Sequence, residues 1–538
     1  MEQVTLGDVT NVCEFILNHG RLQPEKIALA VPKEWDTTKV HRYETVTFGE
    51  MYRKVGNYQE GFRKLGLKDK DRVIILFRPG VDFYAIVLAL LSGGQVPLFI
   101  EAGMGFKRIY QALEDSKAVA VISMEEILKY RFLLPVLLKM KLFSIDSTGF
   151  LVRSVNHLYV ENAPPLTIVP RKPADYAIIT FTSGSTGRPK AADRNHGSLL
   201  EQHHAIKANW TSDADDVDMT CFPVFVLHNM SCGITSVLPA IDLTKPAEVS
   251  PPVVISQTRE WGVTRMSGAP AYVSKIINYL REEHITIPSL RGIACGGAPV
   301  PRELCKTIVE TLPHAESAVV YGSTEAEPVA HVHMSEIAES EGEGFLVGKP
   351  VALIELEIVT IPDELPGVDE RGLVPYRVKT GEPGEIVVKG RHVLREYIDN
   401  PRANRENKIQ TPDGNIWHRT GDVGYQDAQG RIWLLGRRSD MVLHHGKQLF
   451  PFKIEIMVNA LEGIRQSALV QHPDRSRGIM FVELKPGASS VSVQTKLNER
   501  VLREKIIGLE IRVLDQLPMD GRHNSKVDRP KLRKMLMK

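Results

Sequence analysis

The chain has 538 residues, of which 43% are apolar and 25% are charged, and its formal net charge is +2. This length predicts two domains, the composition is typical of a soluble globular enzyme, and the near-neutral charge gives no reason to expect nucleic acid as a partner. The five cysteines form no C-x-x-C pair and the longest apolar run covers only residues 83–91, so we expect a cytoplasmic protein with reduced thiols, without a zinc site or a transmembrane segment.

Strand and helix patterns alternate over residues 46–100. Residues 46–65 begin as a short strand and continue with apolar positions at helical spacing. Residues 72–77 and 96–100 read as strands on either side of an apolar helix at 81–91. This β-α-β order predicts an α/β fold with a mainly parallel sheet covered by helices on both faces.

Residues 128–143 depart from this regular pattern, because large apolar side chains alternate with Lys129, Arg131, Lys139 and Lys141. A basic amphipathic segment is suited to peripheral contact with a membrane surface or to the mouth of a channel for an apolar substrate. The alternative is a buried helix that bends at Pro135.

A loop rich in glycine and hydroxyl residues follows the apolar strand at 176–180. It reads Phe-Thr-Ser-Gly-Ser-Thr-Gly-Arg-Pro-Lys over residues 181–190. Backbone N–H groups and hydroxyls in such a loop can bind one anion, and Lys190 adds charge at its rim. Because Lys190 follows a proline and precedes an alanine, the loop is not a Walker A sequence.

Two further strands end in short polar or glycine-containing turns. Residues 290–299 end in Gly-Gly-Ala-Pro, where the absence of side chains lets a planar base approach the backbone. Residues 319–325 end in Tyr-Gly-Ser-Thr-Glu, which supplies a π-face, hydroxyl donors and a carboxylate suited to a hard cation.

Together with the T-S-G-S-T-G-x-P-K loop, these sequences resemble the adenylate-forming (AMP-dependent synthetase/ligase) superfamily. The resemblance implies ATP and Mg²⁺ as cofactors, Lys526 as the catalytic lysine, a catalytic role for Thr182, and Glu325 as a catalytic residue and the metal ligand. The residues that it assigns to nucleotide binding are Thr182, Ser183, Gly184, Ser185, Thr186, Gly187, Lys190, Gly297, Ala298, Pro299, Tyr321, Gly322, Ser323, Thr324, Asp422 and Arg437.

The expected substrate pocket contains Phe225, Val226, His228 and Gly296. In many acyl-CoA synthetases of the superfamily, a P-x-F-H segment places a histidine between the carboxylate site and the second substrate's tunnel. Here Val226 stands in that place, and the histidine comes two residues later. Either His228 reaches the site from a shifted backbone, or the pocket is more apolar. A lone histidine among apolar residues is more often a core side chain than a catalyst.

The end of the chain resembles the mobile lobe of the superfamily. The resemblance places the ribose contacts at Asp422 and Arg437 and the hinge at Ser439, where Asp or Lys is usual. We therefore expect an ATP- and acyl-binding domain over residues 1–437, which includes a β-barrel-like part, and a small mobile α+β lobe over 438–538. His444 and His445 are expected in a solvated loop.

The sequence specifies the reaction that follows adenylation of the acid less strongly than it specifies the superfamily. The sequences at residues 77–80, 321–330 and 522–527 look most similar to the β-lactone synthetases of olefin biosynthesis. That resemblance implies cyclisation of a 2-alkyl-3-hydroxy fatty acid and enzymes of olefin synthesis as possible partners. The alternatives are a medium- or long-chain acyl-CoA ligase, with Gly446 beside the pantetheine arm, and a degenerate nucleotide-binding module.

Overall fold

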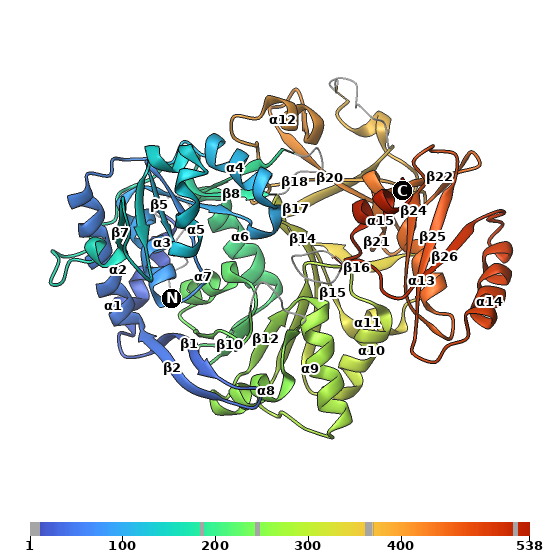
Figure 1. The fold of residues 1–538 in the computed structure, drawn as a ribbon, viewed down its shortest axis with the longest axis horizontal. Coiled ribbons are helices and arrows are strands. Elements are labelled where there is room, and N and C mark those ends of the chain that lie inside the picture. Colours follow the sequence, from blue (N-terminus) through green and yellow to red (C-terminus); the bar gives the residue numbers. More distant parts are fainter. Residues whose placement is uncertain are drawn as a thin grey trace.

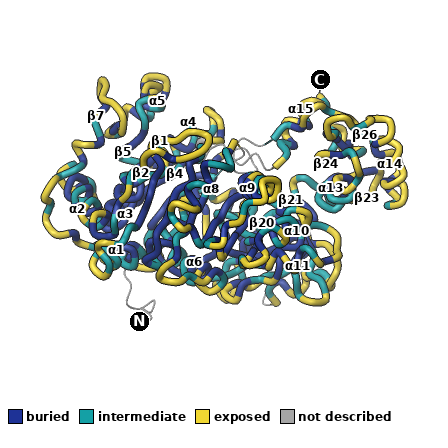
Figure 2. Tube along the Cα trace, turned by 90° about the horizontal axis from the view of Figure 1, so that it is seen from below, coloured by how far each residue is buried: buried dark blue, intermediate teal, exposed yellow. Residues whose placement is uncertain are grey.

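The computed structural model describes residues 11–182, 188–242, 248–360, 368, 371–519 and 526–537. Two large sheets with their covering helices form the main body, and the last hundred residues form smaller sheets at one side of it (Figure 1). Buried strands occupy the centre of the body, and the C-terminal elements project from one end (Figure 2). The observed architecture confirms the predicted α/β fold class.

A seven-stranded sheet contains the strand that leads into the glycine-rich loop. Its order is β7-β6-β5-β3-β4-β8-β9, and all neighbours pair in parallel except β8 and β9. This pairing confirms the mainly parallel sheet expected for this region. The strands are β3 (Arg72–Leu76), β4 (Val96–Ile100), β5 (Ala120–Ser123), β6 (Lys141–Ser144), β7 (Val152–Ser154), β8 (Tyr176–Thr182) and β9 (Lys190–Asn195).

Local sequence explains the helices beside this sheet. The Thr47 side chain accepts a hydrogen bond from the Glu50 N–H, while the Glu50 carboxylate accepts one from the Thr47 N–H, which fixes the start of α2. Gly66 ends α2 in the left-handed conformation, at φ +78°. The helices are α1 (Cys13–Leu22), α2 (Phe48–Leu65), the almost wholly buried α3 (Val81–Gly93), α4 (Phe106–Asp115) and α5 (Glu125–Leu128).

The alternative of one bent helix over residues 128–143 is wrong. Helix α5 ends at Leu128, and two 3₁₀ turns, η2 (Lys129–Phe132) and η3 (Pro135–Lys139), separate it from β6. A proline cannot donate a backbone hydrogen bond and disfavours helical geometry in the residue before it, so Pro135 starts a new turn.

The second sheet is longer and mixed. Its strands β1, β11, β10, β12, β13 and β14 pair in parallel, and antiparallel strands extend this run at both ends. These strands are β1 (Ile27–Trp35), β2 (Val40–Thr47), β10 (Val217–Thr220), β11 (Thr235–Val237), β12 (Arg265–Gly268), β13 (Gly292–Gly296), β14 (Glu316–Ser323), β15 (Ala326–His333), β16 (Phe345–Pro350), β17 (Ile354–Val359), β18 (Gly384–Gly390), β19 (Lys408–Gln410), β20 (Ile416–Gln426) and β21 (Ile432–Arg437).

The helices that accompany this sheet follow its strands along the chain. Proline stands at the first or second position of α7, α8, α9 and α12, where its missing N–H would have no partner inside the helix. The helices are α6 (His196–Asn209), α7 (Pro223–Cys232), α8 (Pro251–Glu260), α9 (Pro270–Glu282), α10 (Arg302–Thr311), α11 (Met334–Glu339) and α12 (Pro401–Asn407).

The C-terminal segment packs on β16 and β21 through its first helix. The Phe452 and Phe345 ring centroids lie 5.2 Å apart, and Lys453 Nζ lies 2.6 Å from Glu343 Oε1. Its elements are β22 (Val442–His444), β23 (Lys447–Leu449), α13 (Pro451–Asn459), β24 (Ile464–Gln471), β25 (Gly478–Leu484), α14 (Ser490–Arg503), β26 (Glu510–Leu514) and α15 (Arg529–Met535). Within the described part of the chain, no helix combines the length and apolar character needed to span a bilayer.

Candidate active site

The antiparallel pair β8 and β9 brackets the glycine-rich loop. Thr182 ends β8 directly opposite Lys190, which begins β9. The five loop residues predicted to bind phosphate, Ser183 to Gly187, lie outside the described residues. Lys190 is only 5% exposed, and its ammonium group lies 5.0 Å from the centre of the Tyr397 ring. The predicted rim lysine is therefore buried against an aromatic face.

Tyr397 connects this lysine to the predicted metal ligand. Its hydroxyl donates a 2.9 Å hydrogen bond to Oε1 of Glu325. The Glu325 carbonyl accepts a 2.8 Å hydrogen bond from the Leu394 N–H, and the Thr324 carbonyl accepts one of 3.1 Å from Arg194. The turn between β14 and β15 is thus held from two sides, which orients the carboxylate that a divalent cation would use.

A second lysine, Lys408, lies on the same tyrosine. Its ammonium group is 5.4 Å from the Tyr397 ring centre and donates to the Leu394 carbonyl. Burial lowers the pKa of Lys408 to about 7, against an opposing effect of Glu325, and burial also lowers the pKa of Lys190. Two buried amines near one carboxylate favour a polyanion such as a triphosphate, which would restore their charge.

A second network joins the predicted adenine and ribose residues. The Tyr321 hydroxyl donates a 2.6 Å hydrogen bond to Oδ2 of Asp422, while Arg437 Nε lies 2.9 Å from Oδ1 of the same carboxylate. Arg437 also donates to the Thr420 carbonyl at 3.1 Å. Burial raises the pKa of Tyr321 well above its usual value, so its hydroxyl remains a donor. The structure therefore brings together three of the predicted nucleotide contacts.

The glycine turn after β13 leaves little room for side chains. A Cβ on Gly296 would lie 2.9 Å from the Val320 carbonyl oxygen, and one on Gly322 would lie 2.9 Å from the Ala326 carbonyl oxygen. Gly297 has φ +78°, which favours glycine. Gly297 is exposed, and Ala298 and Pro299 are half-buried, so this backbone is accessible to a planar ligand.

The predicted pocket residues on α7 face different surroundings. Phe225 packs with Ala294 of β13 and Ala318 of β14, whereas Val226 is fully buried in the core that contains α1, α2 and α3. Consecutive side chains on a helix point about 100° apart, so α7 can place these two neighbours in two different hydrophobic clusters. The Val226 side chain therefore lies in that core, and the Phe225 side chain lies in a different hydrophobic cluster.

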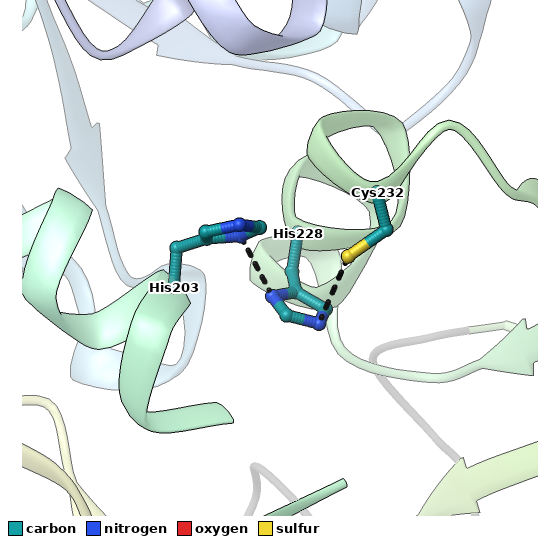
Figure 3. A group of neighbouring side chains, drawn as sticks. All are labelled: His203, His228 and Cys232. Carbon is teal, nitrogen blue, oxygen red and sulfur yellow. Dashed lines mark hydrogen bonds between the residues drawn. The ribbon is translucent and has the colours of Figure 1, made fainter. Parts of the chain in front are cut away.

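His228 takes part in a row of polar groups that the sequence did not reveal. Figure 3 shows His203 of α6, His228 and Cys232 in contact, with the His228 ring in the middle. The two Nδ1 atoms lie 3.1 Å apart, and Cys232 Sγ lies 3.6 Å from His228 Nε2. Burial lowers the pKa of His203 to about 4 and that of His228 well below its usual value, so both rings are neutral at neutral pH.

These three residues are the one group in the described part of the chain with a possible metal-ligand set, since their ligand atoms lie within 4.8 Å of one another. However, the two nitrogens of His228 face different partners, and one ion cannot occupy both sides of a ring. The arrangement is therefore a hydrogen-bonded row as it stands. His228 and Cys232 are four residues apart on α7, whereas His203 comes from α6, and a C-x-x-C pattern does not detect such a mixed set.

Along the chain, the predicted hinge residue Ser439 begins the C-terminal segment and the predicted catalytic Lys526 lies near its end. Arg533 of α15 donates to the Ser439 carbonyl at 3.3 Å and to Oδ1 of Asp440 at 2.9 Å. Lys526 is exposed and precedes Val527, which forms a β-bridge with Met519. The terminal helix is thus tied to the predicted hinge.

The expectation of a solvated double histidine was wrong for His444, which is 3% exposed. One of its ring nitrogens lies 2.8 Å from the Ile507 carbonyl oxygen, and the other accepts a 3.1 Å hydrogen bond from the Gly478 N–H. His445 is exposed. His445 lies beyond the end of β22, in the turn before β23 with φ +47°, so its side chain does not share the environment of His444.

The sequence model of the AMP-binding enzyme family matches residues 18–398. The chain belongs to the AMP-binding enzyme family. This membership confirms the predicted superfamily and identifies the protein as an AMP-forming ligase or synthetase. The motifs that carried the prediction between residues 181 and 325 all lie within the matched range.

Curated relatives match nearly the whole chain. An olefin beta-lactone synthetase of Xanthomonas campestris pv. campestris is 29% identical over 98% of both chains, and one of Stenotrophomonas maltophilia is 30% identical over 97% of both. A 2-succinylbenzoate–CoA ligase of Bacillus cytotoxicus is 23% identical over 97% of this chain and 98% of its own.

Solved structures of other members share the fold. The amide bond synthetase McbA of Marinactinospora thermotolerans superposes with a TM-score of 0.77 at 18% identity, covering 97% of this chain and 99% of its own. The O-succinylbenzoate coenzyme A synthetase of Bacillus subtilis, determined with ATP and a magnesium ion, gives 0.77 at 22% identity, covering 96% and 99%. At these identities the likeness establishes the fold alone.

Proposed function

We propose that this enzyme activates a 2-alkyl-3-hydroxy fatty acid as its acyl-adenylate and then closes it to a β-lactone. In the first step, a carboxylate oxygen attacks the α-phosphorus of ATP and the bond to pyrophosphate breaks. In the second step, the 3-hydroxyl oxygen attacks the acyl carbonyl, AMP leaves, and the hydroxyl proton is released. Both relatives named olefin beta-lactone synthetase match at least 97% of the chain, and this observation carries the proposal.

The described residues fit the nucleotide that adenylation requires. We assign phosphate binding to Lys190 and Lys408, whose burial makes an anionic ligand favourable, together with Thr182 and Thr324. Glu325, oriented by Tyr397, would hold Mg²⁺, which neutralises phosphate charge when bound. The Tyr321, Asp422 and Arg437 network suits ribose hydroxyls, since Asp422 is an acceptor held between two donors.

Lys526 is proposed as the catalytic lysine of a mobile lobe over residues 438–538. A positively charged group that enters for adenylation would stabilise charge on the phosphate oxygens in the transition state. Its exposure and its place behind the Ser439 hinge agree with this role. The division at residue 437 is part of the proposal.

A variant pair tests the lysine. Lys526→Ala should lower acid-dependent pyrophosphate release at least about a hundredfold while ATP binding changes little, because the loss affects the transition state. Lys534→Ala, an exposed lysine in α15, is the matched control and should retain activity. Full pyrophosphate release by Lys526→Ala would refute the assignment.

The second candidate is a medium- or long-chain fatty acyl-CoA ligase. Several relatives are named CoA ligases or synthases, and a Cβ on Gly446 would meet no atom within 4 Å, which leaves space for an extended chain. The two functions differ in product mass. With ATP, Mg²⁺ and a 3-hydroxy acid, a product lighter by one water in the absence of CoA supports the lactone. A product that forms only with CoA and carries it would replace this proposal by the ligase.

A further inference from the structure

Exposed apolar side chains concentrate in one short stretch of the chain. Within 22 residues, six large apolar side chains are between 43% and 71% exposed. We call this group the apolar tip; it consists of Tyr130, Phe132, Leu133, Leu138, Phe150 and Leu151. Single exposed apolar residues are ordinary, but a contiguous group usually marks a surface that binds something.

The apolar tip is built from two segments that hold each other in place. The Phe132 and Phe150 rings stack with their centroids 6.4 Å apart, which joins turn η2 to the loop before β7. Leu128 at the end of α5 and Leu137 of η3 are buried in the core, whereas the side chains of the apolar tip are left on the surface. Leu151 has φ +63°, a costly conformation for a leucine, while its side chain is 57% exposed.

Both segments that carry the apolar tip leave the seven-stranded sheet at its carboxyl edge, the edge at which Thr182 ends β8. Strands β4, β5, β6 and β8 are all parallel within one sheet, so their carboxyl ends lie on one edge. Tyr130, Phe132 and Leu133 follow the end of β5, whereas Leu138 precedes β6 and Phe150 and Leu151 precede β7. The tip therefore extends from the carboxyl edge towards the amino edge beside β6 and β7. With β3 and β4 between β5 and β8, the separation across the sheet is about 15 Å. Figure 2 shows α5, β7 and α4 along this same side of the molecule.

The segment after β4, a strand that lies between β5 and β8 in the sheet, adds apolar and basic groups to the carboxyl edge. Phe106, at the start of α4 after β4, is 60% exposed. Beside it lies an open hollow of about 500 Å³ whose lining includes Lys107, Arg108 and Arg188. Arg188 is paired with Asp115 at 2.8 Å, whereas Lys107 is exposed.

Only some of the basic residues in the amphipathic segment belong to this surface. Arg131 is 7% exposed and lies 3.2 Å from Glu125, and Lys141 begins β6 at the opposite edge, where it donates to the Leu65 carbonyl. Lys129 and Lys139 are exposed within η2 and η3. The apolar tip therefore has exposed lysines within the same turns, a combination suited to a bilayer surface with anionic headgroups.

We propose that the side of the molecule that carries the apolar tip docks on an anionic lipid bilayer, with the tip inserted among the acyl chains. Lys129, Lys139 and Lys107 contact the headgroups. The docking proposal does not depend on the proposed function, but docking would affect how the proposed substrate reaches the enzyme. A fatty acid with two long chains resides in a bilayer rather than in water, and docking brings this source of substrate next to the sheet that contains β8 and Thr182.

Vesicle sedimentation tests the docking. The wild-type chain should sediment with vesicles of phosphatidylcholine and phosphatidylglycerol and only weakly with phosphatidylcholine alone. The triple variant Phe132→Ser, Leu133→Ser, Phe150→Ser should lower the bound fraction about tenfold or more, because each serine removes apolar surface from the membrane-inserted group. Lys129→Gln with Lys139→Gln should weaken binding to the anionic vesicles selectively.

The matched control is Val491→Ser with Ile507→Ser, which removes side chains that are 75% and 72% exposed in the C-terminal segment. It should bind vesicles as the wild type does. An independent readout uses Phe150→Trp, whose added fluorescence should shift to the blue on anionic vesicles. Absence of wild-type sedimentation, equal sedimentation of the triple variant, or a dimer that the triple variant converts to a monomer would each overturn the proposal.

An activity comparison separates docking from the proposed function. Pyrophosphate release with a short, water-soluble 3-hydroxy acid should be equal in the wild type and the triple variant. Release with a long-chain acid presented in anionic vesicles should fall in the triple variant. If neither acid supports release while vesicle binding persists, the proposed function fails and the docking stands.

Discussion

The Tyr397 hydroxyl donates a 2.9 Å hydrogen bond to the carboxylate of Glu325, although the two residues are 72 positions apart. The same ring lies against the ammonium groups of Lys190 and Lys408. One tyrosine thus connects the predicted metal ligand with two buried cations. Burial and the neighbouring Glu325 raise the pKa of Tyr397, so it remains a donor at any pH at which the enzyme works.

Tyr397→Phe tests whether this hydrogen bond orients Glu325. A hydrogen bond to a charged group contributes about 1.5–3 kcal/mol, so we expect the KM for ATP with Mg²⁺ to rise about tenfold or more. Tyr176→Phe is the matched control, since the Tyr176 hydroxyl donates to Glu396 at 3.4 Å on the exposed surface. Kinetics of pyrophosphate release at varied Mg²⁺ measure the effect, and an unchanged KM in Tyr397→Phe would remove Tyr397 from the site.

Lys408 makes ATP binding depend on pH. Its pKa is lowered to about 7 by burial, so above that pH the free enzyme holds it mostly neutral. A bound polyanion favours the charged form, and binding then takes up a proton and weakens as pH rises. Between about pH 6.5 and about pH 8.5 we expect the affinity to fall about tenfold, since each pKa unit corresponds to about 1.4 kcal/mol.

Calorimetry in two buffers with different ionisation enthalpies measures this proton uptake. Lys408→Met should abolish the uptake that belongs to this group, whereas Lys117→Met should retain it. Lys117 is an exposed lysine whose ammonium group lies 2.6 Å from Asp399. Equal proton uptake in the wild type and Lys408→Met would contradict the assignment.

Gly296→Ala should disturb the glycine turn after β13. The new Cβ would lie 2.9 Å from the backbone oxygen of Val320, which belongs to the neighbouring strand β14 and cannot move alone. We expect a loss of about 1–3 kcal/mol in stability and weaker nucleotide binding. Gly80→Ala is the control, because its backbone is extended and no atom lies within 4 Å of the added Cβ. Thermal unfolding with and without AMP compares the two variants.

The buried histidine row should make the protein sensitive to acid. Burial lowers the pKa of His203 from 6.5 to about 4, so the unfolded state binds more protons between these values. Stability then falls as pH falls from 6.5 towards 4, by up to about 3 kcal/mol from this residue.

Replacement of His203 separates its contribution to acid sensitivity from the rest. The drop in Tm between about pH 7.5 and about pH 5 should be smaller in His203→Asn than in the wild type, because the variant lacks this group's proton uptake on unfolding. His445→Asn, which replaces an exposed histidine, should show the full drop. Equal drops in the wild type and both variants would show that His203 is not protonated on unfolding.

The structure decided which side chains share a site. Tyr397 and Lys408 stand in stretches without a recognisable motif, so no local pattern marks them, and they reach Glu325 and Lys190 only through the packing of the two large sheets. His228 and Cys232 lie one helical turn apart on α7, and only the folded chain brings His203 of α6 to the other side of the His228 ring. Contacts between distant segments depend on strand order, which local spacing does not encode.

The sequence by itself determined the family, the alternation of strands and helices near the N-terminus, and the positions of the glycine turns. These follow from short-range physics: apolar periodicity, proline and glycine geometry, and the clustering of donors at strand ends. Only the tertiary structure decided that Val226 faces a core apart from Phe225, that His444 is buried, and that the amphipathic stretch forms two turns with an exposed apolar tip. Those outcomes depend on which neighbours are present to bury a side chain, and the neighbours come from elsewhere in the chain.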